Sequence, residues 1–183
     1  ITIPDSVTEI GWYAFNGCTS LKSISIPNGV TNIDDGTFED CKNLTSITIP
    51  DGVTSIGYYA FLNCKSITSI TIPDSVTKIS NMAFIDCTSL TNVSLPDSLT
   101  EIGSCAFSYC TSLTSITIPN SVMDIGSYAF RDCTSLISIT IPDSVMSIGD
   151  YALGFYLDHI TYNYAKYDNF KIYCYSGTAG EQY

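Results

Sequence analysis

The residues in this chain whose types and spacing could do chemistry are eight cysteines and one histidine. A zinc site needs cysteines in paired C-x-x-C spacing, and the sequence has no such pair. Inward side chains of parallel, neighbouring coils also rarely reach the torsion angle of a disulfide, so we expect free thiols. We expect no metal and no cofactor. Six cysteines recur every 23 residues, which favours a buried column of small apolar side chains. They are Cys18, Cys41, Cys64, Cys87, Cys110 and Cys133.

Cys105 and Cys174 lie outside this column and are the better candidates for reactive thiols. A Cys–His nucleophilic pair would have to use His159, and Cys174 is the nearest cysteine in sequence. No recognisable third group is present to orient such a pair. His159 stands at the leucine position of the repeat, which favours a structural role. We therefore expect no catalytic residue and no enzymatic activity.

A column of Asp or Asn after each proline is the remaining candidate for metal binding. Carboxylates of neighbouring coils could bridge Ca²⁺, which takes six or more oxygen ligands, but no second oxygen ligand recurs beside them. Asp and Asn also favour turns after proline, because they hydrogen-bond to their own backbone, and the turn is the favoured interpretation. The column contains Asp5, Asn28, Asp51, Asp74, Asp97, Asn120 and Asp143.

The prolines reveal the architecture that positions all of these residues. Every interval between them is 23 residues, and the chain has no other proline. A strict period of this length is typical of a solenoid, in which each repeat forms one coil stacked on the last. The prolines are Pro4, Pro27, Pro50, Pro73, Pro96, Pro119 and Pro142.

One repeat shows how a coil is built. Ile24 and Ile26 alternate with Ser23 and Ser25, which is the period of two of a β-strand with one buried face. Pro27 then ends the strand, because it has no N–H to donate. No coil can bury its apolar face alone, so stacking is required. The residues expected to point inward are Leu21, Ile24, Ile26, Val30, Ile33, Phe38, Cys41 and their equivalents.

The stretch CTSLTSITIPNSVMDIGSYAF, residues 110–130, keeps Cys, Leu, Ile, Ile-Pro, Val, Ile and Ala-Phe at the spacing found in the other repeats. This pattern resembles the leucine-rich repeats of the BspA type, a class of 23-residue repeats from bacteria and protists. The resemblance covers residues 1–153. It implies a leucine-rich repeat solenoid with a single curved parallel β-sheet and short turns or 3-10 pieces on the convex side. It also implies a secreted or cell-surface location, and for some members adhesion.

The C-terminal segment departs from the repeat. From Phe155 onward nine of 29 residues are aromatic, and the open apolar end of a solenoid must be covered. We expect residues 1–154 to form the solenoid with seven proline-marked repeats and 155–183 to form a cap. The last solenoid strand is expected at residues 160–162, and a cap strand near 170–175. A short helix is expected from Thr178, which has capping-box spacing to Glu181.

Composition excludes several classes of function. Seven Lys plus Arg stand against 18 Asp plus Glu, and the net charge of −11 would repel nucleic acid. No run of about 18 apolar residues could span a membrane. We expect a monomer that binds a protein or a glycan. The leading hypothesis is a non-catalytic binding or adhesion scaffold, and the alternative is a structural spacer within a larger surface protein.

Two outward columns of Ser, Thr and one Asn make a flat, uncharged surface on the predicted strands. Small polar residues also suit any solvated sheet face, so the pattern alone does not identify a ligand. If this face binds a partner, contact should centre on the middle coils. The candidate binding residues are Ser69, Thr71, Asn92, Ser94, Ser115 and Thr117. A competing candidate is the aromatic segment, where Tyr162, Tyr164, Tyr167 and Tyr175 could stack on sugar rings.

Overall fold

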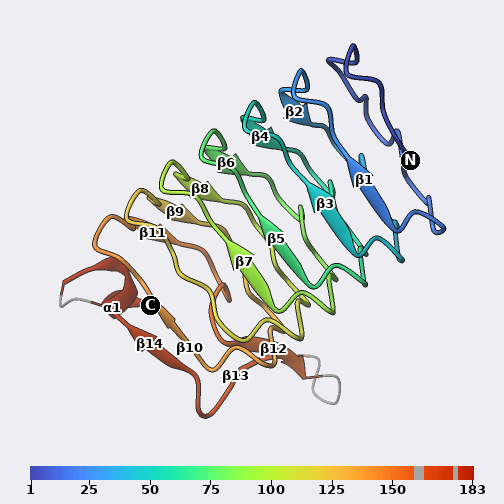
Figure 1. Ribbon diagram of the computed structural model, residues 1–183. Coiled ribbons are helices and arrows are strands. Elements are labelled where there is room, and N and C mark those ends of the chain that lie inside the picture. Colours follow the sequence, from blue (N-terminus) through green and yellow to red (C-terminus); the bar gives the residue numbers. More distant parts are fainter. Residues whose placement is uncertain (159–162, 175–176) are drawn as a thin grey trace.

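The coils of the solenoid stack side by side from the N-terminus to the C-terminal segment (Figure 1). The structure is a computed structural model that describes residues 1–158, 163–174 and 177–183. Two rows of short strands run along the stack on different sides of each coil. The expected leucine-rich repeat solenoid with a parallel sheet is thus confirmed, and the structure adds a second row of strands that the sequence analysis did not anticipate.

The first row forms the strand face. Within the repeats the paired strands are parallel and one repeat apart, so that Ile24 lies beside Ile47 and Ile70 beside Val93. Residues 115–117 carry no strand assignment but keep the alternation of exposed, buried and exposed side chains. The strands are β1 (Ser23–Ser25), β3 (Ser46–Thr48), β5 (Ser69–Thr71), β7 (Asn92–Ser94), β10 (Ser138–Thr140) and β14 (Lys171–Tyr173).

The second row, which we call the second ladder, is one continuous six-stranded parallel sheet. Each strand has only two residues and turns one isoleucine inward, such as Ile56 or Ile79. Two residues are too few to show an alternating pattern, which explains why the sequence did not predict these strands. They are β2 (Asn32–Ile33), β4 (Ser55–Ile56), β6 (Lys78–Ile79), β8 (Glu101–Ile102), β9 (Asp124–Ile125) and β11 (Ser147–Ile148).

The third side of each coil consists of hydrogen-bonded turns. Two residues per coil have positive φ, for example Tyr59 at 56° and Asn63 at 59°. These left-handed residues interrupt any helical path, so the described convex side contains turns and no 3-10 helix. The backbone N–H of Phe38 donates to the carbonyl of Ala60 in the next coil at 2.9 Å. The turns are therefore tied from coil to coil like the strands.

The core consists of columns of identical side chains. The phenylalanine rings from Phe15 to Phe130 stack with centroids 5.0–5.5 Å apart. The isoleucine, leucine, valine and cysteine columns of the middle coils are almost fully buried. In the first coil Phe15 and Cys18 are only partly buried, because a coil packs on one side of them only. The expected inward residues therefore lie inward.

The C-terminal segment continues the strand face in a different register. Ser138 pairs with Lys171, 33 positions later rather than 23, so β14 takes the place beside β10. The ten additional residues are accommodated by an antiparallel hairpin of β12 (Phe155–Asp158) and β13 (Asn163–Lys166). The repeat interval predicts the last solenoid strand at residues 160–162, which lie outside the described residues. The expected cap strand is the one that extends the sheet, because Ile172 matches Ile139 in the buried column.

The chain ends in α1 (Ala179–Gln182), which confirms the expected short helix. The capping-box interpretation is wrong in part: the Thr178 side chain makes no capping hydrogen bond, and the Glu181 carboxylate accepts one from the backbone N–H of Gly177. The Tyr183 hydroxyl accepts a hydrogen bond from the backbone N–H of Leu153 at 3.0 Å. No helix of the described residues is long and apolar enough to cross a membrane.

Candidate functional site

All six candidate binding residues lie on the outer side of the strand face. The register places Ser69 beside Asn92 and Thr71 beside Ser94, so the two columns expected from the sequence are real rows across neighbouring strands. Ser115 and Thr117 continue both rows one coil further, although their segment carries no strand assignment. The structure thus brings all six together on one surface.

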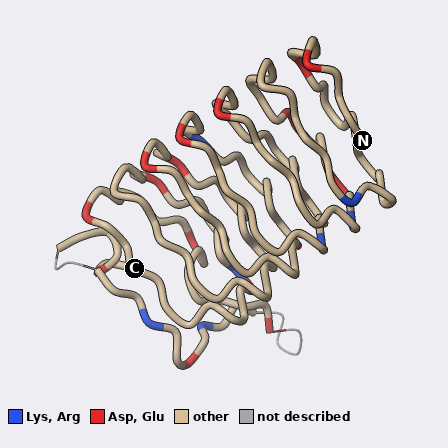
Figure 2. The backbone as a smooth tube through the Cα atoms, in the orientation of Figure 1, with Lys and Arg blue, Asp and Glu red and all other residues tan. Residues whose placement is uncertain are grey.

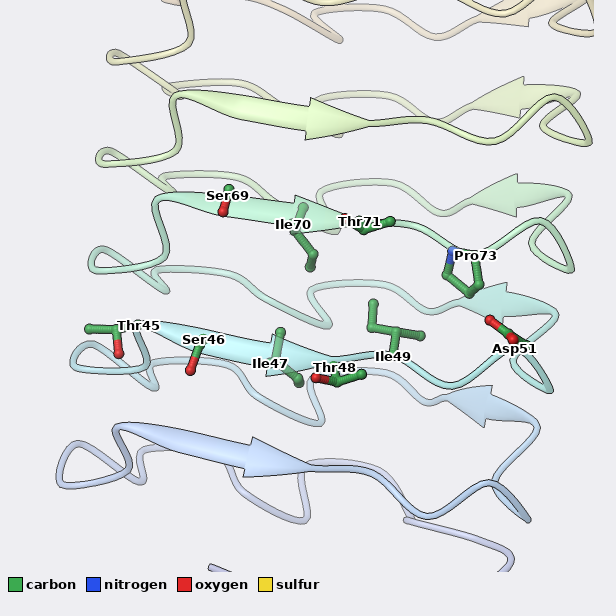
Figure 3. Close-up of a pocket in the computed structure, with 10 residues that line it drawn as sticks. All are labelled: Thr45, Ser46, Ile47, Thr48, Ile49, Asp51, Ser69, Ile70, Thr71 and Pro73. Atoms are coloured by element: carbon green, nitrogen blue, oxygen red, sulfur yellow. The ribbon is translucent and has the colours of Figure 1, made fainter.

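Two of the shallow hollows on this surface include the turn residues that follow the prolines. The first, of about 330 Å³, lies over β3 and β5 and extends from Thr45 and Ser46 to Asp51 and Pro73 (Figure 3). The second, of about 780 Å³, lies further along the stack and includes Thr117, Thr140 and the turn residues. The second hollow lies where the strands reach the prolines, whereas the first extends along the strands to that point. The strand face is therefore not flat, as the sequence suggested, but hollowed.

The side chains that border these hollows belong to the Asp and Asn column, for which the sequence favours a role in turns over calcium binding. Asp51 borders the first hollow, and Asp97, Asn120 and Asp143 border the second. All four are exposed. Among the described residues no group of three or more His, Cys, Asp or Glu side chains could hold a metal ion. Their place directly after each strand-ending proline was the signal that could have added them to the candidate site.

Charge is distributed unevenly around the strand face. Neither row contains a charged residue before Lys171 in β14. Figure 2 shows acidic residues along the turns at one edge of the solenoid, and five of the seven positions after proline are Asp. A ligand on the strand face would therefore meet neutral hydroxyls in the centre and carboxylates at one edge.

The cysteine column has a structural role that the sequence did not specify. The thiol of Cys64 donates to the carbonyl of Phe38 in the preceding coil, with sulfur and oxygen 3.1 Å apart, and Cys87 donates to Phe61 at 3.2 Å. Burial raises the pKa of Cys87 to about 12, so the thiol stays protonated at neutral pH. All eight cysteines are free thiols.

The two cysteines outside the column show no activated environment. Cys105 is partly buried, and desolvation raises the pKa of its thiol although Arg131 acts in the opposite direction. A raised pKa lowers the thiolate fraction and makes Cys105 a poorer nucleophile than the sequence analysis supposed. Cys174 packs against the core beneath α1. His159 lies outside the described residues, so the structural role expected for it stays a prediction.

In the competing aromatic site, at least Tyr164 and Tyr167 have a structural role, because they pack between the solenoid and the C-terminal segment. Arg131 donates to the Tyr164 hydroxyl at 3.2 Å and lies over the rings of Tyr109 and Tyr128 at 4.7 and 5.2 Å from their centroids. Tyr167 is half-buried and stacks on Tyr156. These rings hold the hairpin to the solenoid, which leaves less of them for a sugar. Tyr162 and Tyr175 lie outside the described residues.

The fold and its repeated exposed rows define a class, the leucine-rich repeat solenoids. A family model described as BspA type Leucine rich repeat region, in six copies, matches residues 1–110 and 54–179. The chain belongs to this family.

Two solved structures of bacterial leucine-rich repeat proteins are similar to this chain. The protein from Bacteroides ovatus is 42% identical, with a TM-score of 0.80, over 84% of this chain and 40% of that one. The T. pallidum protein TpLRR is 35% identical, with a TM-score of 0.78, over 81% of this chain and 72% of that one. The chain thus spans 40% of the length of the Bacteroides ovatus protein.

A third solved structure is less similar to this chain. A leucine rich cell surface protein from Faecalibacterium prausnitzii is 22% identical, with a TM-score of 0.48, over 99% of this chain and 80% of that one. The bacterial proteins that match therefore include one described as a cell surface protein. The comparison with curated proteins finds no match.

Proposed function

We propose that this chain is a non-catalytic binding scaffold that recognises a protein or a glycan at the bacterial cell surface or outside the cell. In this proposal residues 1–154 are the binding array and residues 155–183 its cap. Contact centres on the strand face, on the six residues from Ser69 to Thr117 named above. The chain acts as a monomer and binds no nucleic acid.

The observation that carries the proposal is the outward placement of all six side chains in two continuous rows. This surface is rigid, because coils are hydrogen-bonded to their neighbours on the strand face, in the second ladder and in the turns. A rigid surface loses little conformational entropy on binding, which supports recognition by many weak polar contacts. The carboxylates at the margin add hydrogen-bond acceptors beside the hydroxyls.

The near identity of the coils favours a second candidate, a structural spacer. A tuned binding site usually contains irregular residues, and Asn92 is the one break in its column from Ser23 to Ser138. A spacer requires only that the stack be stiff and soluble, which hydroxyl rows satisfy. The two candidates differ in one respect: only the binding scaffold loses a partner when the strand face is blocked.

The test is a pair of bulky substitutions on the strand face, Thr71→Arg with Thr117→Arg. The isolated chain is first screened on a glycan array and on a panel of purified extracellular matrix proteins. We expect a bound partner whose affinity depends weakly on salt, since no charge lies in either row. The arginine pair should weaken that affinity at least roughly tenfold by steric exclusion, measured by surface plasmon resonance.

The matched control places the same substitutions on the second ladder side, as Thr54→Arg with Thr77→Arg, both also exposed threonines. It should bind like the unaltered chain. If the strand-face pair binds normally and Tyr164→Ala with Tyr167→Ala abolishes binding, the aromatic segment is the site instead. If nothing in either screen binds, the spacer is the better account.

A further inference from the structure

The side of the solenoid behind the second ladder carries features that the strand face lacks. The residue two positions after the inward isoleucine on this side of each coil, such as Ile10 or Ile56, forms an outward column, and in most coils it is small or polar. In the first and third coils it is Trp12 and Tyr58, which are 71% and 46% exposed. Trp12 is the only tryptophan of the chain. Large exposed aromatic side chains in a surface otherwise rich in hydroxyls are a sign of a binding site.

Tyr13, next to Trp12 in the sequence, extends this aromatic surface toward the second coil. It is 50% exposed, and its ring lies over Gly36 of the second coil, where an added Cβ would stand 2.2 Å from a Tyr13 ring carbon. The equivalent positions in the later coils are tyrosine, methionine or cysteine. Gly36 therefore makes room for the Tyr13 ring. Trp12, Tyr13 and Tyr58 together span three coils, and we call them the aromatic platform.

A polar groove of about 250 Å³ lies further along the same column. Its floor is a row of glycines, Gly103, Gly126 and Gly149, at which a Cβ would approach the backbone or side chain of the preceding coil to within 2.6 Å. The walls carry hydroxyl, amide and carboxyl groups. The wall residues are Asn81, Ser104 and Ser127 on one side and Glu101, Asp124 and Ser147 on the other.

The side chains and backbone groups of the aromatic platform and the polar groove limit which class of ligand could bind there. The backbone groups along the groove are already used between coils, since Gly103 and Gly126 donate to the carbonyls of Ile79 and Ile102 at 2.9 and 2.8 Å. A peptide could not add as a strand there, and side chains must do the binding. Asp35 lies in the column between Trp12 and Tyr58 and accepts a hydrogen bond from the Tyr58 backbone N–H, and Asp34 and Glu9 add negative charge near it. None of the three has an ion pair among the described residues. Acidic polymers are therefore repelled.

We propose that the aromatic platform and the polar groove bind a linear, uncharged polysaccharide of β-1,4-linked pyranoses that lies along the solenoid axis. Aromatic rings stack on the apolar faces of sugars, and polar walls accept and donate hydrogen bonds to their hydroxyls. The phenylalanine column of the same three coils advances 5.5 and 5.4 Å per coil. Trp12 and Tyr58, two coils apart, are thus separated by about the length of two sugar units in such a chain.

Trp12 provides the measurement. Cellohexaose and N-acetylated chitohexaose are titrated separately while tryptophan emission is recorded. We expect a saturable blue shift with at least one of them, because the sugar covers the exposed indole. Tyr58→Ala should weaken binding roughly tenfold, the loss of one aromatic contact, and leave the melting temperature unchanged. Tyr173→Ala removes an equally exposed ring from the strand-face sheet, 53% exposed, and should bind normally.

Three results would overturn the proposal. One is the absence of an emission change with both hexasaccharides, and another is unchanged affinity in Tyr58→Ala. The third is equal binding of the acidic polymer polygalacturonate. The strand-face pair Thr71→Arg with Thr117→Arg should retain the emission change. The proposal therefore stands or falls independently of the strand face.

Discussion

Between residues 21 and 153 each coil covers the apolar side of its neighbour with the same residue types at the same spacing, whereas residues 155–183 cover the last coil with a hairpin, a strand and a helix. In the repeats a buried isoleucine lies beside another isoleucine, as Ile56 does beside Ile79. In the C-terminal segment unlike groups meet, as where the Tyr183 hydroxyl accepts from the Leu153 backbone. The comparison shows that a coil with identical residues allows another coil to stack on it. A segment with different residues covers the last coil and ends the stack.

The two regions also differ in how polar groups are satisfied. In the repeats one hydrogen bond recurs from coil to coil, and the thiol column from Cys41 to Cys133 donates to one phenylalanine carbonyl after another. At the junction with the C-terminal segment a single residue, Arg131, gathers several partners. It contacts Tyr109, Tyr128 and Tyr164 by cation–π geometry. The stability of the repeats is therefore spread over similar contacts in every coil, whereas that of the junction depends largely on the contacts of one residue, Arg131.

The largest effect is expected when the repeat pattern is broken in the middle. Ile70 is 3% exposed and lies beside Val93 of the adjacent strand in the buried column. Ile70→Asp places an unpaired carboxylate in that column, which should cost about 4 kcal/mol or more of unfolding free energy. We expect loss of the cooperative transition in thermal unfolding followed by circular dichroism.

Thr71→Asp, one residue along and exposed on the strand face, is the matched control. It should change the unfolding free energy by less than about 1 kcal/mol. A normal cooperative melt for Ile70→Asp would show that the inward register is wrong.

A smaller effect is expected when the junction is removed. Truncation after Gly154 deletes β12, β13, β14 and α1 and uncovers the apolar side of the last coil, including Ile139 and Ile141. An exposed apolar coil end promotes association. We expect a lower melting temperature and oligomers in size-exclusion chromatography with light scattering. A monodisperse truncated chain of unchanged stability would mean that the segment is no cap.

A milder change at the same junction is Arg131→Gln. It leaves the hairpin in place but removes its cation–π contacts and the hydrogen bond to Tyr164, at a cost of about 1–2 kcal/mol in the free energy of unfolding, measured by denaturant titration. A loss as large as that of the whole truncation would show that Arg131 alone holds the segment in place.

The smallest effect at neutral pH concerns the thiols. Five column cysteines are buried, whereas Cys18, Cys105 and Cys174 are partly exposed. Reaction with a thiol reagent should therefore leave five thiols protected in the native chain, and all eight should react after denaturation without reductant. Fewer than eight reactive thiols under those conditions would reveal disulfides.

The same burial gives the thiols a pH dependence. Desolvation raises the pKa of Cys41 to about 11 and those of Cys87 and Cys133 to about 12, from 9.0 in the absence of burial. Above about pH 9 the unfolded chain loses thiol protons that the folded chain retains, so the unfolded state gains stability. The unfolding free energy should therefore be unaffected by these groups below about pH 9 and fall between about pH 9 and 12. Replacing Cys87 with alanine should reduce that slope, measured by denaturant titration at several pH values.

Much of this protein follows from its sequence, because one short pattern is repeated in register. The 23-residue interval of proline, cysteine and phenylalanine determines that coils stack, and the alternation around Ile24 determines which side chains face inward. The exposed rows of the strand face follow directly, since in a strand the neighbours of a buried residue point outward. Short range and strict repetition make these features predictable without any knowledge of tertiary contacts.

Other features depended on contacts between residues that no local pattern connects. The two-residue strands of the second ladder exist only because the next coil lies beside them. The place of β14 beside β10 depends on how the hairpin folds out of the way, which a 23-residue count misassigns. The aromatic platform arises because Tyr13 leans over Gly36 one coil away. The sequence by itself determined the structure of the repeated coil and which of its side chains face inward. Only the tertiary structure decided the arrangement where the repetition is interrupted, because the side chains there contact residues from elsewhere in the chain.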